Sequence, residues 1–175
     1  MHGYPPSSQE DSRTMSVDIF QICDLDRGTL QAERDRILLD IRAAIPFASI
    51  MEVGSTAVDG VVGKQDLDFV VRVPLLRFEE ARDILDKRFQ RNQQQLSTAE
   101  YQGYLIPSFL DAAIQLIVEV GKHDNFERFL GLLRANGELR RAYNELKVAW
   151  NGRSMRGYRL AKESFIESAL NNSGP

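Results

Sequence analysis

The sequence contains only one cysteine, Cys23, among its 175 residues. A single cysteine excludes an intramolecular disulfide and the zinc sites that are built from several cysteines. No catalytic signature surrounds Cys23, so we interpret it as a small packing residue rather than a nucleophile. The scarcity of cysteine agrees with a reducing compartment such as the cytosol.

Long apolar runs are also missing, and none reaches the roughly 20 residues that a membrane-spanning helix needs. The first residues, MHGYPPSSQEDSRT, lack the apolar core of a signal peptide. The net charge of −3 and the pI of about 5.5 disfavour a protein that binds nucleic acid over its whole surface. We therefore expect a cytoplasmic protein without a membrane partner; no pattern indicates its oligomeric state.

Histidine is scarce as well, with only His2 and His123. His2 lies in the polar N-terminal stretch, and we interpret His123, beside Asp124, as a surface residue. The sequence contains no HExxH, Walker or GxSxG pattern. Metalloprotease, P-loop and serine-hydrolase interpretations therefore have no support.

The length and composition are typical of one globular domain. Apolar residues make up 43% of the chain, so a chain of this length can bury a core without disulfides. The ends are polar and rich in Ser, Pro, Asn or Gly, which is typical of disorder. We predict a single domain over residues 16–170, with disordered tails at 1–15 and 171–175.

Strand and helix patterns alternate along the first two-thirds of the chain. We expect a helix, two strands, a second helix, a polar loop and two further strands, at residues 29–44, 47–53, 66–73, 78–89, 90–99, 101–107 and 112–120. The last third is helical, with a break at Gly137, a loop flanked by Gly152 and Gly157, and a final helix over 160–170. This order predicts an α/β (α+β) fold, a small mixed sheet with helices packed on it and a helical C-terminal tail.

Two aspartates open the second expected strand, which reads DLDFVVRV from Asp66. Side chains alternate along a strand, so Asp66 and Asp68 share one face while Leu67 and Phe69 point into the core. Two carboxylates on one face repel each other unless a cation compensates them. Magnesium suits such a pair because it prefers carboxylate and phosphate oxygens. The alternative is a strand-opening pair satisfied by backbone N–H groups or by Arg72.

The preceding strand ends at Gly54-Ser55. Glycine lets a backbone approach a ligand closely, and the turn's N–H groups with the Ser55 hydroxyl can hold a phosphate. Thr56 and Lys64 lie close enough in sequence to assist. The alternatives are a plain turn and an exposed loop lysine.

Basic residues gather in the C-terminal third, although the protein as a whole is acidic. Arg140 and Lys147 are seven residues apart and therefore share a helix face. They could hold the phosphates of a nucleotide. The alternative is a solvated helix face.

A Gly-Ser turn followed about ten residues later by Asp-x-Asp on an apolar strand resembles the signature of the nucleotidyltransferase (polymerase-β-like) superfamily. The resemblance implies that Asp66 and Asp68 bind catalytic magnesium and that Gly54 and Ser55 contact a triphosphate. Further residues resemble the GrpB-like (UPF0157) family over about residues 27–168. They are Gly54–Val58, Gly60, Lys64, Phe129, Leu133, Arg134, Leu139, Arg140, Tyr143, Leu146, Lys147, Tyr158, Lys162, Phe165 and Ile166. This closer resemblance implies the nucleotidyltransferase-like fold rather than a particular reaction.

The chain departs from the GrpB-like pattern at Asp59, where proline is usual, and at Leu130-Gly131, where Arg-Asp is usual. A full catalytic set also needs a third carboxylate from a neighbouring strand. The strand over 112–120 is flanked by Asp111 and ends near Glu119, with Gln115 in its middle. Neither acid is clearly placed opposite the aspartate pair.

The sequence therefore supports two functions. The first is a magnesium-dependent transferase that moves a nucleotidyl group from a nucleoside triphosphate to a small-molecule or macromolecular acceptor. The second is a non-catalytic domain that binds a nucleotide or a phosphorylated metabolite. A third alternative is an interaction domain that keeps only the fold.

Overall fold

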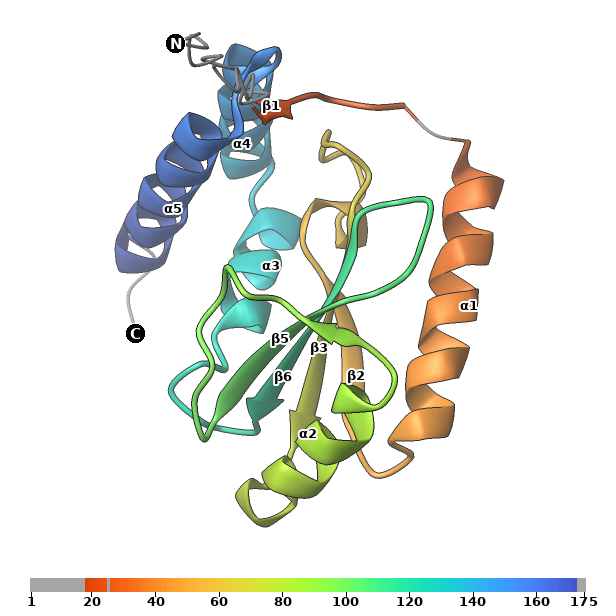
Figure 1. Cartoon of the computed structure of the whole chain (residues 1–175). Coiled ribbons are helices and arrows are strands. Elements are labelled where there is room, and N and C mark those ends of the chain that lie inside the picture. The colour runs from red at the N-terminus through yellow and green to blue at the C-terminus, as the bar shows by residue number, and fades with distance from the viewer. Residues whose placement is uncertain (1–17, 25, 173–175) are drawn as a thin grey trace, which may run out of the picture.

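The computed structural model describes residues 18–24 and 26–172, so the predicted N-terminal tail lies outside the described residues. A five-stranded mixed sheet occupies the centre of the molecule, with helices on both faces (Figure 1). Its strand order is β2-β3-β6-β5-β4; β3 and β6 are parallel and the other neighbours antiparallel. The strands are β2 (Ser49–Val53), β3 (Leu67–Val73), β4 (Gln90–Arg91), β5 (Tyr101–Leu105) and β6 (Ala112–Val118). The mixed sheet predicted from the sequence is confirmed.

One face of the sheet packs against α1 (Arg27–Ala44) and α2 (Phe78–Asp86). The Asp26 carboxylate caps α1 by accepting a hydrogen bond from the Thr29 N–H at 2.9 Å. Leu67 and Phe69 of β3 are fully buried here against Ile41. Because side chains alternate, Asp68 points to the opposite face.

The opposite face is covered by the C-terminal helices α3 (Phe126–Ala135), α4 (Gly137–Trp150) and α5 (Met155–Asn172), which lie together on one side of the sheet in Figure 1. A second core forms there among residues of β2, β3, β5, β6 and these helices, namely Val53, Val70, Tyr101, Ile117, Leu130, Leu133 and Tyr143. No helix within the described residues combines the length and the apolarity needed to cross a membrane.

The predicted helices and main strands are confirmed, with corrections at two places. The segment over 90–99 is not all loop, because Gln90–Arg91 forms the short edge strand β4. The final helix starts at Met155 rather than at residue 160, so Gly157 lies inside it and flanks no loop. A Cβ on Gly157 would lie 2.3 Å from Cζ3 of Trp150, so glycine permits close packing of α5 against the end of α4. The predicted C-terminal tail begins inside α5, which reaches Asn172.

A second, two-stranded sheet was not expected. β1 (Ile19–Phe20) pairs antiparallel with β7 (Arg153–Ser154), between α4 and α5. The Gly152 N–H donates to the Phe20 carbonyl at 2.8 Å, and the chain then continues to Cys23, whose N–H donates to the Gly63 carbonyl at 2.9 Å. Cys23 itself is exposed, so its interpretation as a packing residue is wrong.

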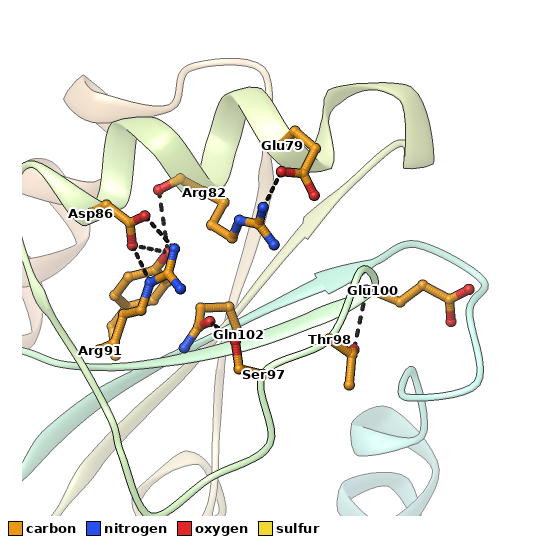
Figure 2. A network of polar contacts seen from close by, with 9 residues as sticks. Glu79, Arg82, Asp86, Arg91, Ser97, Thr98, Glu100 and Gln102 are labelled. Carbon is orange, nitrogen blue, oxygen red and sulfur yellow. Dashed lines mark hydrogen bonds and ion pairs between the residues drawn. The ribbon is translucent and has the colours of Figure 1, made fainter.

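Helix α2 is tied to the β4–β5 edge by a network of polar contacts (Figure 2). Arg91 pairs with Asp86 at 2.5 Å, and Asp86 also accepts a hydrogen bond from the Tyr104 hydroxyl at 3.0 Å. On the adjoining loop, the Ser97 hydroxyl donates to Gln102 Oε1 at 2.6 Å. This network joins α2 to the edge of the sheet and includes neither Asp66 nor Asp68, so we assign it a structural role.

Candidate functional site

The Gly54-Ser55 turn lies directly beside Asp68. Val53, the last residue of β2, is the register partner of Asp68 on β3. Gly54 adopts φ +82° and ψ −169°, a conformation that is almost exclusive to glycine. A Cβ on Gly54 would lie 3.0 Å from Asp68 Oδ2. Glycine is therefore needed here both for its backbone conformation and for the close approach to the carboxylate.

The turn is fixed to the entry of β3. Ser55–Ala57 forms a short 3-10 helix, and the Thr56 hydroxyl donates to the Asp66 carbonyl at 2.9 Å. Thr56 thus holds the two segments together. Gln65, just before Asp66, has φ +62°, which is uncommon for a residue with a side chain and is often found near functional sites.

Lysines from three different segments surround the two aspartates. Lys64 lies 3.8 Å from Asp66 and 2.5 Å from Asp111. The fully buried Lys147 of α4 donates to the Val62 carbonyl at 2.7 Å. Lys162 of α5 lines the same small cavity as both aspartates. These cations compensate the charge of the acids.

Burial and neighbouring charges shift the pKa values of these groups. Burial, reinforced by the charge of Asp66, raises the pKa of Asp68 to about 6, although Lys162 and Lys64 oppose the shift. Burial and then the charge of Lys162 lower the pKa of Lys147 to about 7. Burial opposes the charge on Lys64, but its hydrogen bond to Asp111 and the nearby carboxylates outweigh this and raise its pKa. Asp68 and Lys147 can therefore change charge near neutral pH.

These residues enclose a polar cavity of about 20 Å³. That volume has room for about one water molecule or ion. The Phe20 ring closes it by stacking on Tyr158, with ring centroids 3.7 Å apart and planes 15° from parallel. We call this space the polar cavity; it is lined by Phe20, Ser55, Lys64, Asp66, Asp68, Lys147, Tyr158 and Lys162.

A larger cleft of about 260 Å³ adjoins the polar cavity and shares Asp68 and Lys162 with it. It runs between the sheet and the helices α3 and α5, and we call it the apolar cleft. Its lining is Val53, Gly54, Asp68, Gln115, His123, Asn125, Phe126, Phe129, Leu130, Leu133, Tyr143, Lys162, Ile166 and Leu170. The interpretation of His123 as a surface residue is wrong, since it is half-buried and its Nε2 atom is fully enclosed.

Arg140 does not join the aspartates, although it shares a helix with Lys147. Its guanidinium donates to the carbonyls of Leu133 at 2.7 Å and Arg134 at 3.0 Å, at the end of α3. It lines a separate cavity of about 590 Å³ together with Thr56. Arg34, which also lines that cavity, is paired with Glu52 at 2.5 Å. The structure therefore brings Gly54, Ser55, Lys64 and Lys147 to the aspartates, and Arg140 to a different place.

The neighbouring strand supplies no third carboxylate. β6 runs parallel to β3 with Ala113 beside Asp68 and Gln115 beside Val70. Asp111 instead extends toward Lys64 at the exposed surface, and Glu119 follows the far end of β6. Among the described residues, no group of three or more His, Cys, Asp or Glu side chains is placed to hold a metal ion.

The site also contains residues that the sequence interpretation left out. Lys162 and Tyr158 matched the GrpB-like pattern but had no assigned role at the aspartates, and Phe20 carried no local signal for this position. Tyr158 follows Lys147 in the next helix, so its approach depends on how α4 and α5 pack. Phe20 lies near the N-terminal end of the sequence, far from Tyr158. The available signals for Lys162 and Tyr158 were this match to the GrpB-like pattern and the gathering of basic and aromatic residues in the C-terminal third.

Comparisons with known proteins bear on the family and the fold of the chain. The sequence profile described as GrpB protein matches residues 27–172. A UPF0157 protein of Vibrio cholerae is 35% identical over 133 residues, which are 75% of this chain and 71% of that protein. The crystal structure of conserved protein GrpB from Enterococcus faecalis is similar with a TM-score of 0.60 and 14% identity, over 88% of this chain and 99% of that one. A chain of the GLD-2/RNP-8 complex is similar with a TM-score of 0.51 and 14% identity, over 85% of this chain and 58% of that one.

The mixed sheet, the C-terminal helices and the solved structures that resemble them define a nucleotidyltransferase-like fold. Within this class, the sequence matches identify the relatives more closely. The chain belongs to the GrpB family.

Proposed function

We propose that this protein transfers a nucleotidyl group from a nucleoside triphosphate to the hydroxyl of an acceptor. The observation that carries the proposal is the contact between the Gly54 turn and Asp68, with Asp66 and lysines from three segments lining the same polar cavity. A glycine turn beside paired carboxylates and cations is suited to a polyphosphate chain, because its N–H groups can bind phosphate oxygens.

Two of the residues that line the polar cavity, Asp66 and Asp68, are of the kind that binds a magnesium ion. Asp66 and Asp68 supply the oxygen ligands that magnesium prefers, and the cavity of about 20 Å³ is of the size that one ion or water fills. These two carboxylates would hold the ion, which when bound supplies positive charge to the phosphates. The lysines already compensate the aspartates in part, so we expect binding of the metal and of the nucleotide to depend on each other.

In the proposed reaction, the oxygen of the acceptor hydroxyl forms a bond to the α-phosphorus of the triphosphate. The bond between that phosphorus and the oxygen bridging to the β-phosphate breaks, pyrophosphate leaves, and the hydroxyl proton passes to solvent water. The Ser55 hydroxyl and the turn's N–H groups orient the phosphates, while Lys147 and Lys162 stabilise the charge of the leaving pyrophosphate.

A triphosphate requires more room than the polar cavity offers while Phe20 is stacked on Tyr158. The segment that carries Phe20 pairs in a sheet of two short strands, and such pairs are marginally stable. We therefore propose that the Phe20 segment moves away when the nucleotide enters. Local opening of such a segment costs less free energy than global unfolding.

One observation favours the second function, a domain that binds a nucleotide or phosphorylated metabolite without turnover. The strand next to Asp68 carries Ala113 and Gln115 where a third carboxylate would complete a catalytic set. With only two acids and three lysines lining the polar cavity, an anion could be held without a metal.

Calorimetry with each common nucleoside triphosphate, with and without magnesium, separates the two functions. Transfer predicts metal-dependent binding that is lost in Asp68→Asn and kept in Asp59→Asn, whose carboxylate is exposed at the separate cavity. Pyrophosphate release with a panel of hydroxyl acceptors then tests turnover. Binding that needs no metal, without pyrophosphate release, would support the second function instead. The transfer proposal fails if no triphosphate binds under either condition.

A further inference from the structure

The apolar cleft is elongated and has chemically different ends. Lys162, Ile166 and Leu170 line it at four-residue intervals along α5, so it follows about 12 Å of that helix. One end meets the polar cavity at Asp68 and Lys162. The other end lies near the start of α3, because the Arg128 guanidinium donates to the Leu170 carbonyl at 3.0 Å.

His123 and Asn125 line the end that is far from Asp68. Asp68 is the second residue of β3, whereas His123 follows β6, whose last residue pairs with Val73 at the end of β3. The five residue-to-residue steps from Asp68 to Val73 correspond to about 16 Å of strand. The two polar ends of the apolar cleft therefore lie near opposite ends of β3.

The middle of the cleft is apolar. Phe129, Leu130 and Leu133 of α3 face Ile166 of α5 across it. Its volume of about 260 Å³ equals roughly nine groups of the size of a water molecule, at about 30 Å³ each. A slender molecule with an apolar body of eight to ten heavy atoms, as a rough estimate, fits these dimensions.

The imidazole of His123 has an unsatisfied hydrogen-bonding atom among the described residues. Its Nε2 atom is fully enclosed and has no hydrogen-bond partner among the described residues. The ring is tilted against Tyr101, with centroids 5.2 Å apart, and the Tyr101 hydroxyl points to Gln115 Oε1 at 3.4 Å. A buried polar atom without a partner costs free energy. Because Nε2 has almost no accessible surface, the His123 ring must turn before a ligand with a polar group at this end can bind it and recover that free energy.

We propose that the apolar cleft binds the acceptor, and that the acceptor is a small molecule with polar groups at both ends of an apolar body. One hydroxyl lies at Asp68 and Lys162, and a second polar group hydrogen-bonds to His123. This inference rests on the proposed transfer function for the identity of the ligand as an acceptor. A polynucleotide is a poor occupant, because the lining between the ends offers apolar side chains rather than partners for phosphates.

Two simple alcohols test the proposal on the full chain without nucleotide. Octanediol with a hydroxyl at each end has nine bonds between its two oxygen atoms. The backbone of three residues also has nine bonds and spans roughly 10–11 Å when extended, so the two oxygen atoms of the diol can lie about that far apart. Octanol has the same body and one hydroxyl. Calorimetry should show octanediol binding roughly fivefold to tenfold more tightly than octanol, the value of one hydrogen bond to an otherwise unsatisfied group.

Variants locate the binding. His123→Phe keeps an aromatic ring against Tyr101 and should remove the advantage of the diol while leaving octanol affinity unchanged. Ile166→Phe fills the cleft and should weaken both alcohols, whereas Val148→Phe, on the exposed side of α4, should weaken neither. Circular dichroism reports whether each variant is folded. Equal affinity of the two alcohols, or a diol advantage that persists in His123→Phe, overturns the proposal.

The same samples separate this inference from the transfer function. If nucleoside triphosphate binds with magnesium but neither alcohol binds, the inference about the cleft fails and the transfer proposal stands. If the diol binds through His123 but no triphosphate binds, the cleft is a ligand site and its role as an acceptor site is overturned. If both bind, labelled nucleotide should appear on the diol together with released pyrophosphate, and its absence contradicts the acceptor role.

Discussion

The carboxylate of Asp68 lies against the Cα atom of Gly54, so closely that an added Cβ would be 3.0 Å from Oδ2. The contact joins the end of β2 to the start of β3, and it puts backbone N–H groups next to an acid. Any side chain at residue 54 would have to displace the Asp68 carboxylate, the very group to which we assign the metal. Substitution of Gly54 by alanine, which adds a single methyl group, therefore tests the contact.

Gly54→Ala should lower the free energy of unfolding by about 1–3 kcal/mol, because alanine is strained at φ +82° and ψ −169°. It should also abolish magnesium-dependent binding of nucleoside triphosphate. Gly60→Ala is the matched control, since Gly60 has φ +81° but open space where the Cβ would lie. Urea unfolding and calorimetry of both variants check this. If Gly60→Ala loses nucleotide binding as Gly54→Ala does, backbone strain rather than the contact with Asp68 is responsible.

Asp68→Asn should make the protein more stable at neutral pH. The pKa of Asp68 is raised from 3.8 to about 6, so its protonated form favours folding below pH 4 and that contribution is lost as the pH rises through 6. Asparagine remains neutral, so the variant should match the parent near pH 4 and exceed it above pH 6 by an amount on the order of 2–3 kcal/mol. Urea unfolding at pH 4, 5 and 7.5 measures the difference. A difference in stability between variant and parent that does not depend on pH would contradict a buried Asp68 whose pKa is raised.

Lys147→Met should weaken triphosphate binding roughly tenfold or more at pH 6.5, because a charged hydrogen-bond donor is removed from the polar cavity. The pKa of Lys147 is lowered to about 7, so its positive charge is lost as the pH rises from 6.5 to 8.5. The affinity of the parent protein, measured without magnesium, should therefore fall over this range, and the affinity of Lys147→Met should fall less, by the contribution of Asp68 alone. Arg140→Met, changed on the same helix at the separate cavity, should keep the pH dependence. Identical pH profiles for the parent and Lys147→Met would show that Lys147 does not bind the phosphates.

Much of the site could be predicted because its signals are local. The alternation in β3 fixed which face Asp68 takes, and the glycine before Ser55 marked the turn. Partners far apart in the sequence could not be predicted in this way. The seven-residue spacing of Arg140 and Lys147 is correct as helix geometry, but the carbonyls at the end of α3 bind Arg140 elsewhere.

Two other differences have the same physical origin. A two-residue strand such as β1 has no periodicity to read, so the path of Phe20 to Tyr158 follows only from tertiary packing. His123 lies in a polar stretch typical of a surface turn, yet the ring of Tyr101 and the cover provided by α3 enclose it. The local sequence pattern thus predicted the helices, the strands and the acidic pair. The shape of the cavities depends instead on helices that are distant in the sequence and pack against the sheet.

Ala113→Asp should strengthen metal binding. Ala113 is the register partner of Asp68 on β6, and both side chains point to the same face of the sheet. A carboxylate there adds a third oxygen ligand, while in the absence of metal it adds like-charge repulsion and should lower the thermal midpoint. Thermal unfolding with increasing magnesium should show a larger stabilisation than in the parent or in Ala43→Asp, which places the same charge on the exposed side of α1. Equal magnesium responses in the three proteins would mean that the aspartates do not form a metal site.

Phe20→Ala should increase the affinity for nucleoside triphosphate while it lowers stability. The Phe20 ring is almost fully buried and closes the polar cavity on Tyr158, so its removal opens room for phosphates and also deletes a buried aromatic side chain. Loss of such a side chain typically costs about 3–5 kcal/mol. Ile19→Ala is the control, because Ile19 lies on the same strand with 47% of its surface exposed and does not line the cavity. Affinity and stability that change in opposite directions in Phe20→Ala, with little change in Ile19→Ala, identify Phe20 as a gate. Weaker nucleotide binding in Phe20→Ala would show instead that its ring helps to form the nucleotide site.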